Sequence, residues 1–262
     1  MSQLVFNRYE KKYLMPGPVY DELWERLQEH MVVDQYGLST ICNIYYDTKD
    51  DLLIRRSIEH PKYKEKLRLR SYGVPKKNSK VFLEIKKKYD RIVNKRRIEL
   101  PLDAAYDYLN LGIRPENDCQ ILKEIDFFLQ RYQLEPRLYL AYDRVALYGK
   151  EDPEFRLTFD SRIRSRRMSV GLEYGDFGTL LLPDSWYLME SKIQNAAPKW
   201  FSDLLTELRI YSTSFSKYGN IYKKEHGVWD AEGMMKHQLE NWRDIWQDDD
   251  QEIREYRRQM VC

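Results

Sequence analysis

The stretch that decides the fold is KLRLRSY, residues 66–72. Charged and apolar side chains alternate along it, and successive side chains of a β-strand point to opposite faces of a sheet, so the alternation predicts a strand. Lys66, Arg68 and Arg70 share one face, with Leu67 and Leu69 behind them. The strand therefore has one basic face and one apolar face.

The same alternation recurs along the chain. The residues that share a charged face in the other segments are Arg8, Glu10 and Lys12; Glu84, Lys86 and Lys88; Lys95 and Arg97; Tyr142 and Arg144; Arg156, Thr158 and Asp160; and Glu190 and Lys192. One such strand alone is typical of any sheet with a solvated face. As a set, however, these faces are rich in Lys and Arg and almost devoid of Ser, Thr, Asn and Gln.

A sheet of six or more strands tends to curl or close, because twist accumulates and open edges are liabilities. We therefore expect an α+β fold: a closed antiparallel β-barrel with flanking helices and a C-terminal helical tail. Neither a linker nor an internal repeat is visible, which favours a barrel domain over residues 1–227 and an amphipathic tail over 228–262. In that tail Met235, Leu239, Trp242 and Trp246 form an apolar stripe for packing.

Positive charge is concentrated in the predicted strands. The formal net charge is only +2, yet residues 55–99 hold 17 Lys and Arg against 5 Asp and Glu, whereas residues 228–262 hold 5 against 9. Burying one unpaired ammonium group costs several kcal/mol, so a dozen would exceed the roughly 5–15 kcal/mol stability of a domain. If the basic face is concave, it is a hydrated tunnel neutralised by a few carboxylates and a bound polyanion. The charge pattern thus predicts a substrate built from phosphates.

Several other classes are disfavoured. No stretch approaches the roughly 18 apolar residues of a membrane span, and residues 1–13 lack the apolar core of a signal peptide. Three cysteines, far apart, are typical of reduced thiols in the cytoplasm. Neither of the common Gly-rich nucleotide-binding loops occurs. We therefore expect a cytoplasmic protein without a membrane span.

A set of short motifs, in order from residue 6 to about 218, resembles a known family. The motifs are Arg8-x-Glu10-x-Lys12-Tyr13, Tyr45-Tyr46-Asp47-Thr48, Lys66-x-Arg68-x-Arg70, Leu83-Glu84-Ile85-Lys86-x-Lys88, Tyr142-x-Arg144, Arg156-Leu157-Thr158-Phe159-Asp160, Leu188-Met189-Glu190-x-Lys192 and Ser216-Lys217-Tyr218. Each motif alone is weak, but the ordered set is similar to the polyphosphate-polymerase (VTC) domain of the triphosphate tunnel metalloenzymes (the CYTH-like superfamily). Eukaryotic relatives add an SPX domain and membrane helices. The resemblance here is to a stand-alone form without them.

The resemblance implies transfer of the terminal phosphate of ATP onto a polyphosphate chain, with Mn²⁺ or Mg²⁺ as cofactor. It implies metal ligation by Glu190, with Glu10 as a second candidate. The implied catalytic residues are Arg144, Arg156 and Lys217. The implied substrate-binding residues are Arg8, Lys12, Lys66, Arg68, Arg70, Lys86, Lys88, Tyr142 and Lys192. Partners would be ATP and polyphosphate or pyrophosphate, and no nucleic acid is expected.

Two other functions remain open. Hydrolytic and cyclase members of the superfamily typically begin with Glu-x-Glu-x-Lys, whereas Arg8 stands at the first Glu position here. One fewer carboxylate weakens the hold on a second metal, which favours a polymerase over a triphosphatase. A non-catalytic module that binds polyphosphate or RNA is the other alternative, although no RNA-binding motif appears and Glu10 and Glu190 would repel phosphate without a metal.

Some of these residues also have structural interpretations. Glu84 would neutralise Lys86 and Lys88 across strands, and Asp47 would cap a short helix over residues 50–58. Asp160 would be a turn residue, and Tyr142 would pack in the wall of the barrel.

Overall fold

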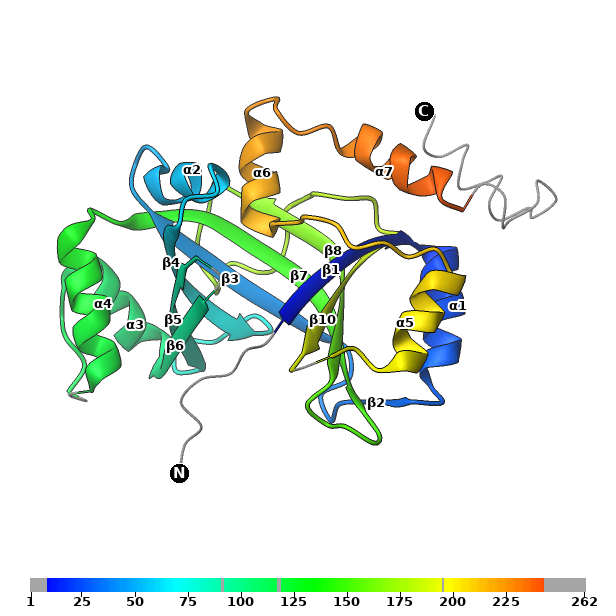
Figure 1. Cartoon of the computed structure of the whole chain (residues 1–262). Coiled ribbons are helices and arrows are strands. Elements are labelled where there is room, and N and C mark those ends of the chain that lie inside the picture. Colours follow the sequence, from blue (N-terminus) through cyan, green and yellow to red (C-terminus); the bar gives the residue numbers. More distant parts are fainter. Residues whose placement is uncertain (1–8, 91, 117–118, 195, 243–262) are drawn as a thin grey trace.

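The computed structural model describes residues 9–242, apart from 91, 117–118 and 195. The described part contains one antiparallel sheet flanked by helices (Figure 1). The strands are β1 (Tyr9–Pro16), β2 (Met31–Val33), β3 (Ser39–Asp47), β4 (Tyr63–Tyr72), β5 (Lys80–Tyr89), β6 (Ile92–Pro101), β7 (Glu135–Gly149), β8 (Arg156–Arg166), β9 (Thr179–Leu180) and β10 (Trp186–Ile193). The helices are α1 (Gly17–Leu27), α2 (Leu52–Ile58), α3 (Leu102–Leu111), α4 (Gln120–Arg131), α5 (Lys199–Glu207), α6 (Lys217–Glu225) and α7 (Ala231–Glu240).

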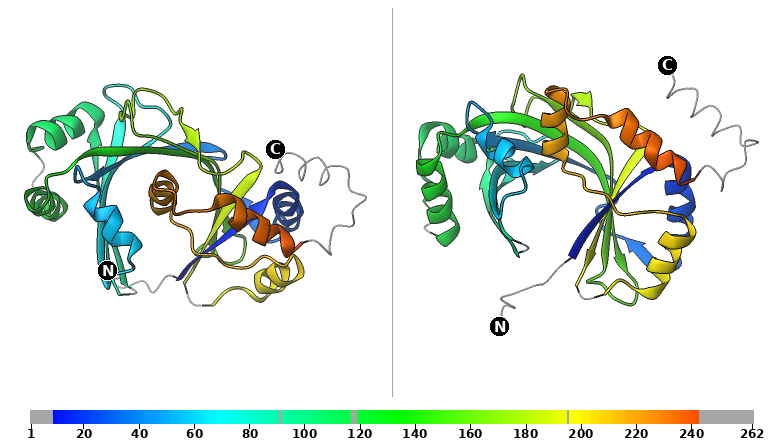
Figure 2. Two further views of the ribbon diagram at one scale, coloured as in Figure 1. Left: turned by 90° about the horizontal axis from the view of Figure 1, so that it is seen from above. Right: turned by 45° about the horizontal axis from the view of Figure 1, so that its top comes forward.

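The sheet is strongly curved but not closed by hydrogen bonds. Its strand order is β1-β10-β8-β7-β3-β4-β5-β6, with β2 added to β7 and β9 to β8. Seen from above, the sheet curls around α6 (Figure 2). Within the described residues no pairing joins β1 to β6, so the antiparallel sheet is confirmed and closure of the barrel is not. Burial lowers the pKa of Lys95 on β6, and the charges of Arg68, Arg70 and Lys192 lower this pKa further, so cations of several strands lie close to Lys95.

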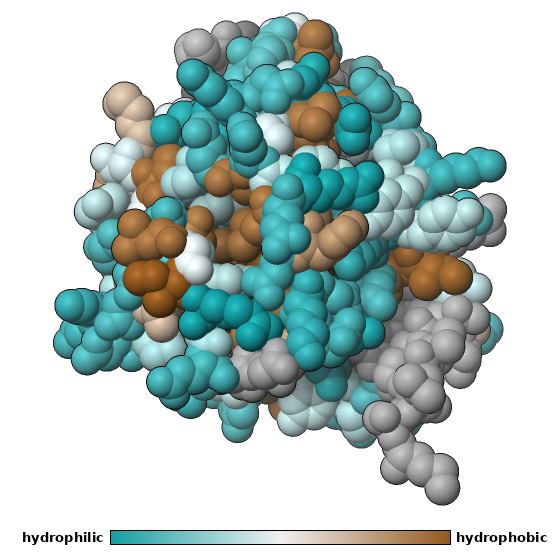
Figure 3. All heavy atoms as spheres, turned by 90° about the vertical axis from the view of Figure 1, so that its left-hand side faces the viewer, coloured by the Kyte–Doolittle hydropathy of each residue, from teal (hydrophilic) through white to brown (hydrophobic). Residues whose placement is uncertain are grey.

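Helices α3 and α4 cover the apolar side of β4, β5 and β6. Leu67 and Leu69 of β4 are fully buried in one cluster with Leu122, Ile125 and Phe128 of α4. Those three helical residues recur every three positions, which places them on one face of α4. On the outward side of this region polar residues surround scattered apolar ones (Figure 3). The prediction that Leu67 and Leu69 lie behind the basic face is confirmed.

Helices α1 and α5 cover a second part of the sheet's convex surface, formed by β1, β8 and β10. Val19, Leu23 and Leu27 of α1 are buried with Leu157 and Phe159 of β8. Because Leu157 and Phe159 are packed outward, their neighbours Arg156, Thr158 and Asp160 face inward. The alternation in the sequence therefore sets which side chains reach the concave surface.

One end of the concave surface is apolar. There Leu14, Leu140 and Leu188 from the sheet are buried with Phe215 and Ile221, the latter from α6. Helices α2 and α7 contribute to the same cluster and cover that end (Figure 1). The basic side chains are therefore confined to the remainder of the concave surface.

Helix α2 is held by a buried carboxylate, as one interpretation of Asp47 required. Asp47 accepts hydrogen bonds from the backbone N–H groups of Thr48, Leu53 and Ile54, at 2.8, 2.8 and 2.9 Å. It also accepts one from the Tyr218 hydroxyl at 3.2 Å, which ties α2 to α6. The capping interpretation of Asp47 is confirmed.

The predicted C-terminal stripe is described only as far as Trp242. Met235 and Trp242 are buried, in two different clusters with residues of the sheet, and Trp246 lies outside the described residues. No helix within the described ranges is both long and apolar enough to cross a membrane. Cys42 and Cys119 are free thiols, and a cytoplasmic location stays a prediction.

Candidate active site

Pairing of β1, β10 and β8 sets the predicted metal ligand beside a cation. Lys12 of β1 stands opposite Glu190 of β10, and Glu190 stands opposite Thr158 of β8. Directly opposite residues in antiparallel strands have Cβ atoms about 4.5–5.5 Å apart and share a face. One step along, Glu10 stands opposite Lys192. The two candidate metal ligands therefore lie diagonally to each other on the same face.

Glu190 is an ionised carboxylate surrounded by cations. Its side chain is 13% exposed, and one carboxylate oxygen lies 3.7 Å from the Lys192 Nζ. Burial alone would raise the pKa of Glu190, but the charges of Lys192, Lys217 and Lys12 lower this pKa to about 2. Beside it, the Thr158 hydroxyl is buried and has no hydrogen-bond partner among the described residues. Glu190 is thus charged, and within the described part of the chain its nearest ion-pair partner is Lys192 at 3.7 Å.

Asp160 of β8 gathers two of the predicted catalytic residues. Its side chain is fully buried and accepts hydrogen bonds from Arg144 of β7, through Nε at 2.5 Å and Nη2 at 2.7 Å. Lys217, the first residue of α6, donates to the same carboxylate at 2.5 Å. The Tyr142 ring lies against both cations, 5.0 Å from the Arg144 Cζ and 4.5 Å from the Lys217 Nζ. Asp160 lies within a strand, so the interpretation of it as a turn residue is wrong.

Glu84 of β5 holds a second pair of cations. It accepts a hydrogen bond from the Arg68 Nε at 2.7 Å, and its other oxygen lies 3.7 Å from the Arg70 Nη1. Neutral side chains complete the support: Arg68 also donates to the Tyr45 hydroxyl at 3.1 Å, and Arg70 donates to the Asn43 Oδ1 at 3.0 Å. The expected partners of Glu84 were Lys86 and Lys88. That expectation is wrong, because Arg68 stands directly opposite Glu84 in the register.

We expect crystals grown with sulfate or phosphate to hold anions on this face. The arginines Arg68, Arg70 and Arg144 converge there from β4 and β7, and each has N–H groups beyond those that bind its carboxylate. Electron density for an anion that contacts these three side chains would confirm the expectation. Anions found only on the convex surface would contradict it.

Two lysines of the face, Lys66 and Lys86, differ from Arg68, Arg70 and Arg144 in having no carboxylate partner among the described residues. Lys66 of β4 stands opposite Lys86 of β5, and neither has an ion-pair partner in the described part of the chain. Burial and the charges of Lys86, Lys64 and Lys12 lower the pKa of Lys66 to about 7. A bound anion would supply the missing negative charge.

We expect the affinity for inorganic tripolyphosphate to fall as the pH rises from 7 to 9. The anion stabilises the protonated form of Lys66, whose pKa is about 7 in the free protein, so binding above that pH takes up a proton. Lys66→Arg keeps the charge and does not titrate, so it should remove this uptake. Calorimetry in EDTA, in two buffers of different ionisation enthalpy, measures the number of protons taken up on binding. Protons that the ligand itself gains or loses contribute equally to the two proteins, so the difference between them reports on Lys66. Equal proton uptake by wild type and Lys66→Arg would contradict the expectation.

The remaining predicted residues are less enclosed or outside the described chain. Arg156 stands opposite Lys192 on the same face but is exposed, and its Nε lies 3.4 Å from the Pro153 carbonyl oxygen. Arg8 lies outside the described residues. Lys88 continues the lysine row of β5.

The site residues predicted from the sequence left out several residues of this face. Lys95 of β6, which the alternation had grouped with Arg97 on a charged face, stands opposite Lys86. Tyr45 and Asn43 accept hydrogen bonds from Arg68 and Arg70. Both are neutral, so the pattern of charged residues along the chain carried no sign of them.

No three His, Cys, Asp or Glu side chains come together as a metal site within the described residues. Asp160 and Glu84 are already bound to cations, so among the described residues Glu190 and Glu10 remain as the candidate metal ligands of the face. A metal here would therefore need most of its ligands from elsewhere.

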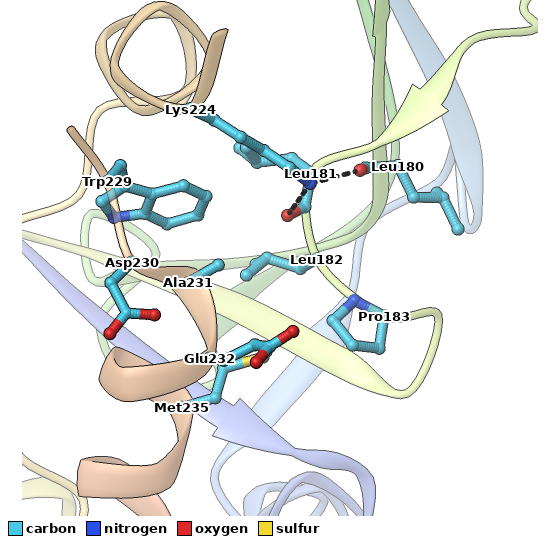
Figure 4. A pocket seen from close by; sticks show the side chains of 10 residues that line it. All are labelled: Leu180, Leu181, Leu182, Pro183, Lys224, Trp229, Asp230, Ala231, Glu232 and Met235. Atoms are coloured by element: carbon cyan, nitrogen blue, oxygen red, sulfur yellow. Dashed lines mark hydrogen bonds between the residues drawn. The ribbon is translucent and has the colours of Figure 1, made fainter. Parts of the chain in front are cut away.

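A cavity of about 410 Å³ lies apart from this face (Figure 4). It is formed between residues 180–183 and the segment that joins α6 to α7, and Trp229 and Met235 are among its lining residues. Lys224 points into the same region and donates to the Leu180 carbonyl at 3.2 Å. None of the predicted site residues lines this cavity, so it does not compete with the concave face as the site.

Comparison with known proteins places the chain in a family. The model of the VTC domain matches residues 7–226. The vacuolar transporter chaperone complex subunit 4 of Trypanosoma cruzi (strain CL Brener) is 24% identical over 245 residues. That match covers 79% of this chain and 30% of the relative, so the chain spans less than a third of the relative's length.

Among solved structures, a putative adenylate cyclase from Bacillus halodurans is similar with a TM-score of 0.51. The two are 16% identical, and the match covers 79% of this chain and 92% of that one. At this identity the likeness supports the fold alone. The family match, by contrast, includes every strand that carries the cationic face, and on that basis this chain belongs to the VTC domain family.

Proposed function

We propose that this chain transfers the terminal phosphate of ATP onto a polyphosphate chain on its cationic concave face, with the help of a divalent metal. One observation carries the proposal: Arg and Lys side chains from strands along the whole strand order, and from α6, converge on one face of the sheet, where carboxylates are few. Two of those carboxylates, Glu84 and Asp160, are already neutralised by cations. The surplus positive charge suits a donor and an acceptor that are both phosphate anions.

The chemistry needs little more than such a face. Phosphoryl transfer is mostly positioning and charge neutralisation, and Arg and Lys hold phosphate oxygens well. An acceptor phosphate is already an anionic oxygen nucleophile, so it requires no general base, whereas a hydrolase must position and deprotonate water. Glu84 and Asp160 are bound to arginines and so are poorly suited as bases. Because few carboxylates of the face could act as a general base, the site favours transfer over hydrolysis.

The residues fit a divalent cation that is held largely by its substrate. Mg²⁺ is usually bound through one or two carboxylates together with substrate phosphates, and Mn²⁺ accepts the same oxygen ligands. Glu190 would hold the ion, with Glu10 as the second carboxylate. The Thr158 hydroxyl beside Glu190, which has no hydrogen-bond partner in the described part of the chain, offers a further oxygen. When bound, the ion would neutralise charge that develops on the phosphate oxygens.

Incubation of the purified chain with ATP and Mn²⁺, followed by gel electrophoresis of the products, tests the proposal. We expect polyphosphate chains longer than the substrate, and slower hydrolysis of inorganic tripolyphosphate with the same metal. Release of orthophosphate alone would instead favour the triphosphatase.

Arg8→Glu should shift the balance toward hydrolysis. The substitution restores the Glu-x-Glu-x-Lys opening of the hydrolytic relatives, and so adds a carboxylate that a second metal or a water can use. It also removes a cation, so affinity for long polyphosphate should fall. The ratio of orthophosphate to polyphosphate produced from ATP measures the shift, and an unchanged ratio would contradict it.

A further inference from the structure

Asp160 of β8 connects β7 and α6 through ion pairs, and it neutralises a lysine at the N-terminus of α6. Lys217 is the first residue of α6, and a cation is unfavourable near a helix N-terminus, where the helix dipole is positive. The Ser216 hydroxyl caps this end through the Gly219 N–H at 3.2 Å, so Ser216 does not hold the lysine. The lysine is instead held by Asp160 on β8, which at the same time binds Arg144 on β7.

We propose that Asp160 is a positioning residue: its carboxylate holds Lys217 and Arg144 in the orientation in which they meet the transferred phosphate. The inference rests on the proposed function. Both carboxylate oxygens have cationic nitrogens at 2.5–2.7 Å, which leaves no room for a metal at Asp160.

A role in proton transfer does not fit either. Burial would raise the pKa of Asp160, but Arg144 and Lys217 hold this pKa well below its usual range. The carboxylate therefore stays ionised throughout the working pH range. The effect of replacing it should accordingly not change between pH 6 and 9.

Asp160→Asn separates positioning from simple neutralisation. If Asp160 only reduced the positive charge, its loss would strengthen anion binding and leave turnover intact. We expect instead that kcat falls about a hundredfold, as when a group that stabilises the transition state is lost. The Kd for tripolyphosphate should stay within about threefold, because the lost negative charge offsets the loss of an ordered Lys217. A wild-type kcat with tighter binding would overturn the proposal.

A double-mutant cycle with Lys217→Ala tests the coupling directly. Measured in EDTA with tripolyphosphate, Lys217→Ala should weaken binding about tenfold in the wild-type background. In the Asp160→Asn background it should weaken binding less than twofold, because the lysine is no longer held. Equal effects in the two backgrounds would overturn the proposal.

Asp143→Asn is the matched control. Asp143, on β7, is a buried carboxylate like Asp160, but its side chain lies on the convex face of the sheet. There it accepts hydrogen bonds from the Thr40 Oγ1 at 2.8 Å and the Arg164 Nη2 at 3.1 Å. We expect a lowered melting temperature with wild-type kcat. If both variants lost kcat in proportion to their stability, the role of Asp160 would be structural.

Two further features keep the test decisive. Because breaking a buried ion pair is strongly destabilising, Asp160→Glu serves if Asp160→Asn does not fold: it keeps the charge but displaces the carboxylate, and should still lower kcat. The binding cycle needs no turnover. A wild-type protein that makes no polymer but shows the coupling would refute the proposed function and leave the positioning role standing; polymer synthesis without coupling would do the reverse.

Discussion

Glu190→Gln is expected to abolish metal-dependent turnover, with a loss of at least about a thousandfold. Glutamine keeps the shape of the side chain but removes the charge that a hard divalent cation requires. Binding of tripolyphosphate in EDTA should become tighter, because a negative charge has left the cationic face. Loss of activity together with stronger anion binding would support a metal-binding role, because a variant with a folding defect would also lose anion binding.

The same substitution has a defined effect on stability. The pKa of Glu190 is lowered to about 2 in the folded protein, so its charge stabilises the fold above the ordinary carboxyl pKa, and this contribution disappears as the pH falls through 2. We therefore expect a lower melting temperature for Glu190→Gln at pH 7 and a smaller difference at pH 3. Glu207→Gln removes an exposed carboxylate paired with Arg26 at 2.6 Å and is the control, with wild-type activity expected. Unchanged turnover in Glu190→Gln would remove Glu190 from the mechanism.

Arg144→Ala and Arg156→Ala should each lower turnover about a hundredfold, or on the order of 3 kcal/mol, by removing a cation that stabilises charge in the transition state. The two should differ in stability. Arg144 is bound to a fully buried carboxylate, and its removal leaves Asp160 with Lys217 alone, whereas Arg156 is exposed. Steady-state kinetics with thermal unfolding of both variants measure these effects.

The controls for this pair are cations away from the face. Arg56 lies on α2 and Lys77 lies in the segment between β4 and β5, and both are exposed. Arg56→Ala and Lys77→Ala should leave turnover within about twofold of wild type. If these two lowered turnover as much as Arg144→Ala, the net charge of the protein and not a defined site would be responsible.

Much of the site's placement was predictable from local pattern. The period of two in residues 66–72 assigned Lys66, Arg68 and Arg70 to one face and Leu67 and Leu69 to the other, and the structure confirms both. The same reasoning placed Glu190 and Lys192 together. This works because the side-chain period of a strand is a local property of the backbone, so it does not depend on which strand lies alongside.

The partners of the charged residues were not predictable in that way. Glu84 was expected to neutralise Lys86 and Lys88 across strands, but those lysines lie on its own strand and it binds Arg68 and Arg70 of the neighbouring strand. Asp160 was assigned to a turn, yet one of its partners, Lys217, is 57 residues away. Opposition across strands depends on register, and register depends on turns and packing that alternation alone does not encode.

The sequence by itself determined which side chains are basic, which faces they share and to which family the chain belongs, because each of these is carried by residue order over short ranges. The tertiary structure alone decided that the sheet curls with no pairing of β1 and β6 over the residues that the structure describes, that α6 places Lys217 beside Asp160, and that one end of the concave surface is apolar. These features arise from contacts between elements far apart in the chain. Which contacts form depends on how much apolar surface each helix can bury against the sheet and on how the cations of the concave face share its few carboxylates.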